Sequence, residues 1–288
     1  MRRVEIILGP TAVGKTAYSI RKAQEYGCPI LNCDSRQLYK GMTIGTAVPS
    51  PEELAAVPHY FIQILPPDAV YTAGKYEMDA MDLVEKLFAE GCETLIMTGG
   101  SMLYIDAFCY GLDNFPDVPI QYRQQLMECL DTEGVDVLAA QLKKLDPETA
   151  AEIDLSNGQR VVRALEVCLF TGKPFSSFKS RNAKPRDFEI VKTGLTMPRE
   201  QLYERIDRRV LDMMDRGLLD EVRSLLPYRD CPALQTVGYK ELFAYLDGKT
   251  TLDEAVRLIQ RNTRHYAKRQ NTWWKRDTSI NWLPHTGI

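Results

Sequence analysis

The fold is decided by the stretch V-E-I-I-L-G-P-T-A-V-G-K-T, residues 4–16. Its first five residues form a short, mostly apolar run that predicts a β-strand. Ala17, Ile20 and Ala23 follow at helical spacing and predict a helix. Between the two, residues 9–16 match GxxxxGK[ST], the phosphate-binding loop, in the strand–loop–helix context that this motif requires. The sequence therefore predicts a protein that binds a phosphate ester.

Each part of this P-loop has a role in holding phosphate. The glycines let the backbone turn its N–H groups onto phosphate oxygens, and the helix that follows adds the positive end of its dipole. Lys15 supplies a mobile cation, and Thr16 offers a hydroxyl that can bind Mg²⁺. The loop alone leaves open whether the ester is a nucleotide such as ATP. The predicted phosphate-binding residues are Gly9, Pro10, Thr11, Ala12, Val13, Gly14, Lys15 and Thr16.

Length and composition bound the class of protein. With 288 residues, of which 44% are hydrophobic, the chain can bury a full core as one large domain or as a domain with an insertion. A net charge of −3 gives no global basic field, so a nucleic-acid partner would need a local basic patch. The seven cysteines show no CxxC pair and indicate reduced core thiols. No apolar run approaches the roughly 20 residues of a membrane span, and the first strand leaves no room for a signal peptide, so we expect a soluble, cytoplasmic protein.

Polar residues follow two further predicted strands. Residues 30–33 read as a strand that ends in Asp34-Ser35-Arg36-Gln37, and the ligand crevice of a parallel sheet lies outside such strand ends. We therefore expect Asp34 near the phosphates, although an N-cap of the next turn is the alternative. Residues 94–97 read as a strand that ends in Thr98-Gly99-Gly100-Ser101. The Asp that a P-loop NTPase usually carries there is missing, which disfavours ATP hydrolysis, and the glycines indicate close approach of a substrate to the backbone.

The middle of the chain changes character. Residues 116–185 read as short helices joined by polar and proline-bearing turns, and strand character resumes at Phe188. We predict an α/β protein whose P-loop parallel-sheet core (1–115 and 186–288) carries a small helical insertion domain (116–185). Within the insertion, Arg160 and Arg163 share one helix face while Val161 and Val162 point elsewhere. These arginines suit a phosphate contact or a solvated helix face.

The last long helix carries the strongest charge signal. Residues 257–276 include seven basic side chains and no acidic one. Aromatic residues accompany them, a combination suited to phosphate contacts and base stacking, whereas the alternative is a solvated helix balanced by acids elsewhere. A helix that begins at Pro198 adds Arg205, Arg208 and Arg209, either as surface ion pairs or, for one of them, as a contact to a diphosphate. The basic stripe consists of Arg257, Arg261, Arg264 and Lys268, and the aromatic residues are Tyr266, Trp273 and Trp274.

Taken together, these motifs resemble the tRNA dimethylallyltransferases, which prenylate an adenosine beside the anticodon. The similarity runs from residue 9 to about residue 274, in family order. Two positions depart from the pattern: Ser101 stands where threonine is usual, and Val48 where lysine is usual. The matching motifs are G-P-T-A-x-G-K-T (Gly9–Thr16), D-S-x-Q-x-Y (Asp34–Tyr39), G-M-x-I-G-T-A (Gly41–Ala47), G-G-[TS]-M-L-Y (Gly99–Tyr104), Q-R-x-x-R-A-L-E-V (Gln159–Val167), G-Y-K-E (Gly238–Glu241) and A-K-R-Q-x-T-W (Ala267–Trp273).

The resemblance implies transfer of a dimethylallyl group from dimethylallyl diphosphate to N6 of the adenosine 3′ of the anticodon, position 37 of tRNA. It implies Asp34 as general base, Lys15, Arg209 and Mg²⁺ on Thr16 as the groups that stabilise the leaving diphosphate, and Ser101 as an anchor for a flipped base. The implied partners are the anticodon stem-loop of tRNA and the prenyl donor, with the enzyme a monomer. The implied tRNA-binding residues are Asp34, Ser35, Arg36, Gln37, Ser101, Arg123, Gln159, Arg160, Val161, Val162, Arg163, Arg261, Arg264 and Lys268.

Three alternatives stay open at this stage. A prenyltransferase acting on free AMP or ATP would not need the basic stripe or the arginines of the insertion. A small-molecule kinase fits the P-loop but not the missing strand-end Asp. A non-catalytic RNA-binding protein would keep the stripe but would need no carboxylate at Asp34.

Overall fold

The protein divides into two compact units in the computed structural model, which describes residues 2–113, 115–179 and 183–284. The core unit consists of Met1–Cys109 and Pro185–Ile288, and the helical unit of Tyr110–Lys184. The backbone N–H of Lys184 donates to the carbonyl of Tyr110 (2.8 Å), so the chain enters and leaves the helical unit at neighbouring residues. This is why the unit begins before residue 116, where the helical pattern of the sequence starts.

The core unit is built on one sheet of six parallel strands. The order β3-β2-β4-β1-β5-β6 places the strand before the P-loop in the interior of the sheet, and it confirms the predicted α/β class. The two edge strands were not predicted, because β3 has only two residues and β6 ends in a proline, which edge strands tolerate. The strands are β1 (Arg3–Leu8), β2 (Ile30–Asn32), β3 (His59–Tyr60), β4 (Thr94–Thr98), β5 (Glu189–Thr196) and β6 (Ile280–Pro284).

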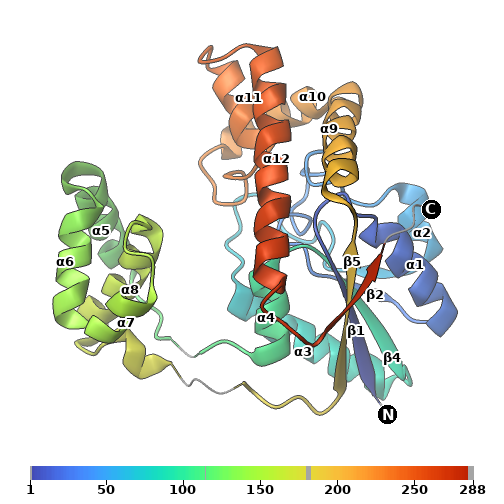
Figure 1. The fold of residues 1–288 in the computed structure, drawn as a ribbon, viewed down its shortest axis with the longest axis horizontal. Coiled ribbons are helices and arrows are strands. Elements are labelled where there is room, and N and C mark those ends of the chain that lie inside the picture. Colours follow the sequence, from blue (N-terminus) through green and yellow to red (C-terminus); the bar gives the residue numbers. More distant parts are fainter. Residues whose placement is uncertain (1, 114, 180–182, 285–288) are drawn as a thin grey trace. The chain divides into compact units, whose positions relative to one another are not determined.

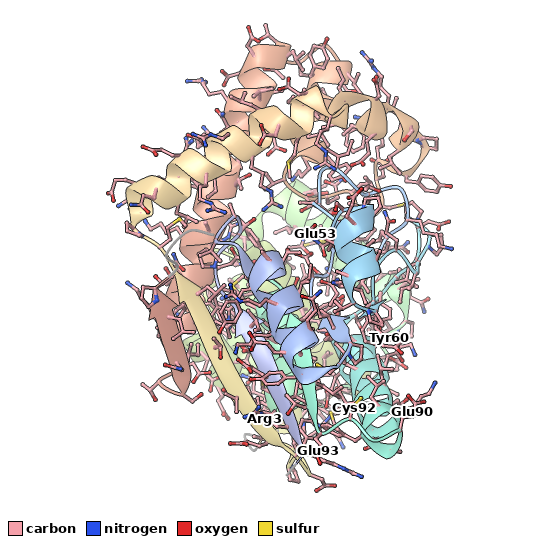
Figure 2. The ribbon with its side chains drawn as sticks, turned by 90° about the vertical axis from the view of Figure 1, so that its right-hand side faces the viewer. Arg3, Glu53, Tyr60, Glu90, Cys92 and Glu93 are labelled. Atoms are coloured by element: carbon pink, nitrogen blue, oxygen red, sulfur yellow. The ribbon has the colours of Figure 1, made fainter. Side chains whose placement is uncertain are left out.

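The helices of the core unit surround the sheet and extend past one end of it. Helix α1 lies across one face of the strands (Figure 2), whereas α9 and α12 stand side by side beyond their carboxyl ends (Figure 1). The apolar face of α9 packs into the core, since Leu202, Ile206, Val210 and Met213 are buried. The bounds are α1 (Lys15–Tyr26), α2 (Pro51–Ala56), α3 (Ala73–Ala89), α4 (Met102–Tyr110), α9 (Arg199–Asp215), α10 (Leu218–Ser224), α11 (Tyr239–Leu246) and α12 (Leu252–Trp274), with a 3₁₀ turn at Leu226–Tyr228.

The helical unit has its own small core. Asn157 caps the helix that follows it by accepting from the N–H of Arg160 (3.3 Å). Val161 and Val162 on that helix are fully buried among leucines of the neighbouring helices. The elements are α5 (Ile120–Glu133), α6 (Val135–Leu145), α7 (Pro147–Glu152), α8 (Gly158–Thr171) and a 3₁₀ turn at Phe175–Phe178.

The chain is anchored as soon as it re-enters the core unit. The buried guanidinium of Arg186 donates to Glu77 (3.1 Å) and to the carbonyls of Ala107 (3.1 Å) and Phe108 (2.9 Å). Residues 179–187 are charged and low in apolar residues, a composition that predicts a linker, and part of this stretch lies outside the described residues. The last residues of the stretch belong to the packed core.

Two glycines let the loops at the carboxyl ends of the strands pack against their neighbours. Gly9 has a φ of +144°, and a Cβ there would lie 2.6 Å from the carbonyl oxygen of Leu195 in β5. A Cβ at Gly99 would lie 2.3 Å from the carbonyl of Cys33. Since no side chain fits at these distances, both residues must be glycine for the loops after β1 and β4 to pack where they do.

Candidate active site

Two cavities open where the strands end. The first, about 460 Å³, lies between the P-loop and α9, and the second, about 560 Å³, lies between α9 and α12. Four residues line both cavities: Thr11, Asp34, Thr46 and Arg209. A group bound in the first cavity can therefore meet a group bound in the second at these four side chains.

The first cavity is built to hold an anion. The P-loop residues that line it are Thr11, Ala12, Gly14, Lys15 and Thr16, and α9 contributes Arg205, Arg208 and Arg209. Helix α1 begins at Lys15 behind the left-handed Gly14, with no side-chain cap and no acidic residue in its first turn. Its first N–H groups and the positive end of its dipole are thus available to phosphate.

The remaining predicted loop residues are buried and support the conformation of the P-loop. Gly9, Pro10 and Val13 are buried and do not line the cavity. The side chain of Val13 is completely inaccessible, and its N–H donates to the carbonyl of Pro10 (3.3 Å). Their contribution is to fold the loop, so that Thr11, Ala12 and Gly14 line the cavity.

Lys15 is held against the loop itself. Its Nζ donates to the carbonyls of Gly9 (2.9 Å) and Pro10 (3.0 Å). Burial lowers the pKa of Lys15 to about 8, against the opposing effect of the negative Asp34. The side chain is therefore charged at neutral pH, with a proton that it loses more readily than an exposed lysine does.

Arg209 reaches the same loop from α9. Its Nη1 donates to Oγ1 of Thr11 (3.3 Å). Burial lowers the pKa of this guanidinium, again opposed by Asp34. Of the three arginines on this part of α9, Arg209 is the one with a described contact to the P-loop, which supports its predicted place in the diphosphate site.

Asp34 stands at the junction of the two cavities with one oxygen fixed. The N–H of Arg36 donates to Oδ1 (2.9 Å), the turn-capping bond that the sequence left as an alternative. Among the described residues, Oδ2 has no hydrogen-bond partner. Asp34 thus does both things: one oxygen orders the turn, and the other can take a proton.

Ser101 holds that turn in place. Its Oγ accepts from the N–H of Ser35 (2.8 Å) and donates to Oγ of Ser35 (2.9 Å). The hydroxyl is buried, and Ser101 lines neither cavity. The structure gives it a positioning contact to the turn after β2, whereas a contact with RNA stays a prediction.

The glycine pair after β4 packs tightly against the protein and also lines the first cavity. The sequence indicated that Gly99 and Gly100 admit a substrate to the backbone, and because both line that cavity this stays a prediction. A Cβ at Gly99 would meet the backbone of Cys33, and a Cβ at Gly100 would lie 2.6 Å from Nε2 of Gln270.

Three other residues from the turn after β2 are placed differently. Ser35 and Arg36 line the second cavity, where Arg36 also donates to the carbonyl of Pro232 (2.9 Å). Gln37 lines the first cavity, and its Nε2 donates to the carbonyls of Thr46 (3.0 Å) and Ala47 (2.8 Å). The amide of Gln37 therefore supports the neighbouring loop.

That loop, residues 41–47, is a fixed wall of both cavities. The carboxylate of Glu221 in α10 accepts from the N–H groups of Thr43 (3.0 Å), Ile44 (2.6 Å) and Gly45 (2.9 Å). It also accepts from the hydroxyl of Tyr239 (2.7 Å). Nothing in the sequence singled out Glu221, because its partners are distant in the chain.

The second cavity differs from the first in the groups that line it. Arg36, Lys240, His265 and Arg269 contribute cationic or titratable side chains, and Tyr266 contributes an aromatic ring. Burial, together with the negative charge of Asp34, raises the pKa of Tyr266, whose hydroxyl donates to the carbonyl of Gly100 (3.0 Å). An aromatic ring beside cations suits a base with a phosphate attached.

The basic stripe on α12 is partly neutralised, which corrects the expectation that no acid compensates it. Arg257 pairs with Glu254 (2.7 Å), one turn earlier on the same helix. Arg264 pairs with Asp207 of α9, 57 residues away in the chain, which is why the sequence window missed it. Among the described residues, Arg261 and Lys268 have no acidic partner within ion-pair distance, and both are exposed.

The aromatic residues of α12 also differ from the prediction. Trp274 is buried in the core, and Nε1 of Trp273 donates to Asp106 of α4 (2.8 Å). Both tryptophans fix the end of the helix to the core unit instead of forming a stacking surface. Of the three aromatic residues, Tyr266 lines the second cavity.

In the helical unit, three predicted RNA-binding side chains converge. Arg123 and Arg163 both pair with the buried Glu166 (3.3 and 2.6 Å), and Arg123 also donates to Gln159 (2.8 Å). Two guanidinium groups share one carboxylate and stay partly exposed, so the cluster keeps a positive charge. Arg160 is exposed beside it.

Two residues of the same motif were wrongly included. Val161 and Val162 were predicted to bind tRNA as part of the run Gln159–Arg163, but both have no exposed surface. They belong to the apolar face of α8 that builds the core of the helical unit. An RNA strand cannot reach them without unfolding that core.

A further cavity, about 480 Å³, lies at the opposite end of the sheet. It is lined by Glu90, Cys92 and Glu93, which Figure 2 labels near the beginning of β1. No lysine or arginine lines it. An anionic ligand therefore has no counter-charge there, and the candidate site remains at the carboxyl ends of the strands.

The fold and the two joined cavities define a P-loop α/β protein whose anion site opens directly onto a second ligand site. A family profile described as IPP transferase matches residues 37–277. The chain is 48% identical to tRNA dimethylallyltransferase 1 of Bacteroides thetaiotaomicron over 96% of its own length and 90% of that protein. This chain belongs to the IPP transferase family.

Solved structures agree with this assignment. A tRNA isopentenylpyrophosphate transferase from Bacillus halodurans superposes with a TM-score of 0.72 at 37% identity, over 99% of this chain and 90% of the other. A eukaryotic dimethylallyltransferase acting on tRNA gives a TM-score of 0.79 at 28% identity, over 99% of this chain and 74% of the other. Along the described part of the chain, no helix is both long and apolar enough to span a bilayer.

Proposed function

We propose that this protein transfers the dimethylallyl group of dimethylallyl diphosphate to N6 of the adenosine 3′ of the anticodon, position 37 of tRNA. The observation that carries the proposal is the position of Asp34 on the boundary of two cavities. One cavity has the P-loop and cations that suit a diphosphate, and the other has the aromatic and cationic lining that suits a nucleotide. The carboxylate stands where a donor and an acceptor would meet.

The donor's diphosphate is assigned to the first cavity. Lys15, Arg209 and the first N–H groups of α1 face that space, and their positive charge stabilises the negative charge that grows on the leaving oxygen. Lys15 can exchange its bonds to Gly9 and Pro10 for bonds to phosphate, since its Nζ is tied only to loop carbonyls. The carbon–oxygen bond to the diphosphate breaks as the bond from N6 to the allylic carbon forms.

The acceptor is a weak nucleophile that needs a base. The lone pair of an adenine N6 is delocalised into the ring, so loss of its proton must accompany attack. Oδ2 of Asp34 takes that proton in our account, while Oδ1 stays fixed by the N–H of Arg36. To reach the second cavity the adenine must leave the anticodon-loop stack, and Tyr266 offers a ring beside which it can bind.

The donor set of the first cavity fits Mg²⁺ that is bound mainly by the substrate. Thr16 supplies a hydroxyl and Asp212 supplies a carboxylate, both of them oxygen donors. Within the described residues there is no cluster of three or more metal-binding side chains, so the diphosphate and water would complete the shell. When bound, Mg²⁺ would supply neutralising charge to the diphosphate.

The free-nucleotide and kinase alternatives are less well supported. Exposed cations without acidic partners on α12 and a positive cluster in the helical unit suit a polynucleotide better than AMP. The strand end after β4, Thr98 to Ser101, carries no carboxylate of the kind an NTPase uses for its metal. We further propose that the protein acts as a monomer in the cytoplasm.

A single comparison of acceptors tests the proposal. Labelled dimethylallyl diphosphate is incubated with the protein and either unmodified tRNA, AMP or ATP, and kcat/KM is measured for each acceptor. We expect label in tRNA, with kcat/KM for AMP and ATP lower by orders of magnitude. Equal or faster prenylation of AMP would overturn the assignment of tRNA as substrate.

The pKa of Lys15 predicts a pH dependence. Because this pKa is lowered to about 8, the charged form predominates below pH 8 and is lost above it. We expect kcat/KM for dimethylallyl diphosphate to fall by up to about tenfold per pH unit above that value. Lys15→Arg keeps its charge over this range, so its profile should stay flat to higher pH. The same fall in that variant would assign the titration to another group.

The unpaired cations of α12 predict a change in salt dependence. If Arg261 and Lys268 contact tRNA phosphates, Arg261→Gln with Lys268→Gln should lower the slope of log K against log salt by roughly 0.7 to 0.9 per charge. The matched control is Arg264→Gln, which also removes a charge from α12 but leaves Asp207 unpaired. We expect that control to lose stability with little change in slope. An unchanged slope in the double variant would move RNA recognition to the helical unit.

A further inference from the structure

One buried glutamine joins the two loops that form the site. Gln270 lies on the inward face of α12 between Ala267 and Trp274 and is 1% exposed. Its Oε1 accepts from the N–H of Thr11 in the P-loop (2.8 Å). Its Nε2 donates to the carbonyl of Gly100 in the loop after β4 (2.8 Å). A single amide thus satisfies one backbone group of each loop.

The surrounding residues are arranged around this amide. Gly100 has no side chain where a Cβ would lie 2.6 Å from Nε2, so the glycine makes room for Gln270. The hydroxyl of Tyr266, one turn earlier on α12, donates to the same carbonyl of Gly100 (3.0 Å). The loop after β4 is therefore attached to α12 by two hydrogen bonds, one of them through a fully buried side chain.

Thr11 is held from two helices at once. Its N–H bonds to Gln270 of α12, and its Oγ1 accepts from Arg209 of α9 (3.3 Å). The two helices are themselves joined, because Arg264 of α12 pairs with the carboxylate of Asp207 of α9. The conformation of the P-loop at Thr11 is thus set from outside the loop.

We infer that Gln270 is a positioning residue for the prenyl-transfer reaction: it orients the N–H of Thr11 and the Gly100 loop so that the diphosphate site and Asp34 face one another. The inference rests on the proposed function, since it concerns the same site. Gln270 does not line either cavity and touches no reacting atom in this account. Its effect passes through the backbone groups that it holds.

Removing both hydrogen bonds while keeping the volume isolates this role. Gln270→Met should raise KM for dimethylallyl diphosphate by about tenfold or more, since the N–H of Thr11 loses its partner and the carbonyl of Gly100 keeps only the hydroxyl of Tyr266. Affinity for tRNA should change less than twofold. The matched control is Gln260→Met, which removes one glutamine hydrogen bond from the same helix but touches neither loop. We expect wild-type KM for the control.

A carboxyl group at the same position adds a readout that packing alone would not move. In the variant Gln270→Glu, the protonated carboxyl group can accept from Thr11 and donate to Gly100, as the amide does. The ionised carboxylate can no longer donate to Gly100, and it places a negative charge beside the carbonyl of that residue. Burial raises the pKa of the carboxyl group, so the protonated form is reached as the pH falls. The activity of Gln270→Glu relative to wild type should therefore rise as the pH falls.

The outcomes separate the two proposals. A flat activity ratio of Gln270→Glu to wild type across pH, or a KM of Gln270→Met equal to that of Gln260→Met, would overturn the positioning role. Thermal unfolding of each variant is measured alongside, so that a variant that fails to fold is recognised. If Gln270→Met does not fold, the pH dependence of Gln270→Glu tests the positioning role. Wild-type protein that does not prenylate tRNA would instead contradict the proposed function.

Discussion

Asp34→Asn will lower kcat for prenyl transfer by about 10²- to 10⁴-fold, the range typical of general-base loss. Asparagine keeps an oxygen that can accept from the N–H of Arg36, so the turn after β2 should stay ordered. What it loses is the free carboxylate oxygen at the junction of the two cavities. Single-turnover rates with saturating donor and tRNA measure the effect on chemistry alone.

Two controls define that result. Asp34→Ala removes the turn-capping bond as well, so it should lose at least as much activity and some stability. Asp212→Asn removes a carboxylate that lines only the first cavity, and we expect a smaller loss. A rate for Asp34→Asn above about a third of wild type would remove Asp34 from the role of base.

Lys15→Met is the second change with a large expected effect. It removes the buried cation that we propose contacts the leaving group in both the ground state and the transition state, so KM for dimethylallyl diphosphate should rise and kcat should fall. A charge-assisted hydrogen bond of about 1.5–3 kcal/mol corresponds to roughly 10- to 150-fold in kcat/KM. Initial rates at several donor concentrations separate the two parameters.

Lys22→Met is the matched control for this change. Lys22 lies on the same helix, pairs with Glu25 (2.7 Å) and does not line the cavity. Its rates should equal those of wild type. If the wild-type reaction instead required ATP turnover and Lys15→Met abolished that turnover, the P-loop would be acting on a nucleotide and not on the leaving group.

Local patterns in the sequence predicted the frame of the site well. The P-loop lies between a strand and a helix, and Asp34 lies at the end of the next strand, because strand and loop signals within a dozen residues determine both. Short sequence patterns therefore predict which residues lie together at the carboxyl ends of the strands. The strand order was not predicted, because it depends on pairing between strands that are distant in the chain.

Local sequence patterns could not predict contacts between distant parts of the chain. The acid that neutralises Arg264 lies on α9, and the group that fills the space at Gly100 lies on α12. The sequence does mark Gln270 as unusual. It lies three residues after Ala267 and four before Trp274, so its amide falls on a helix face that is otherwise apolar. A buried polar residue needs partners, so such a position marks a contact even before its partner is known.

The location of the product tests the central claim most directly. A tRNA transcript is treated with the protein and dimethylallyl diphosphate in the absence of ATP, digested, and its fragments are mapped by mass. We predict one dimethylallyl group on the exocyclic nitrogen of the adenosine 3′ of the anticodon, with one diphosphate released for each. A transcript that stays unmodified without ATP, or a prenyl group on any other nucleotide, would contradict the account.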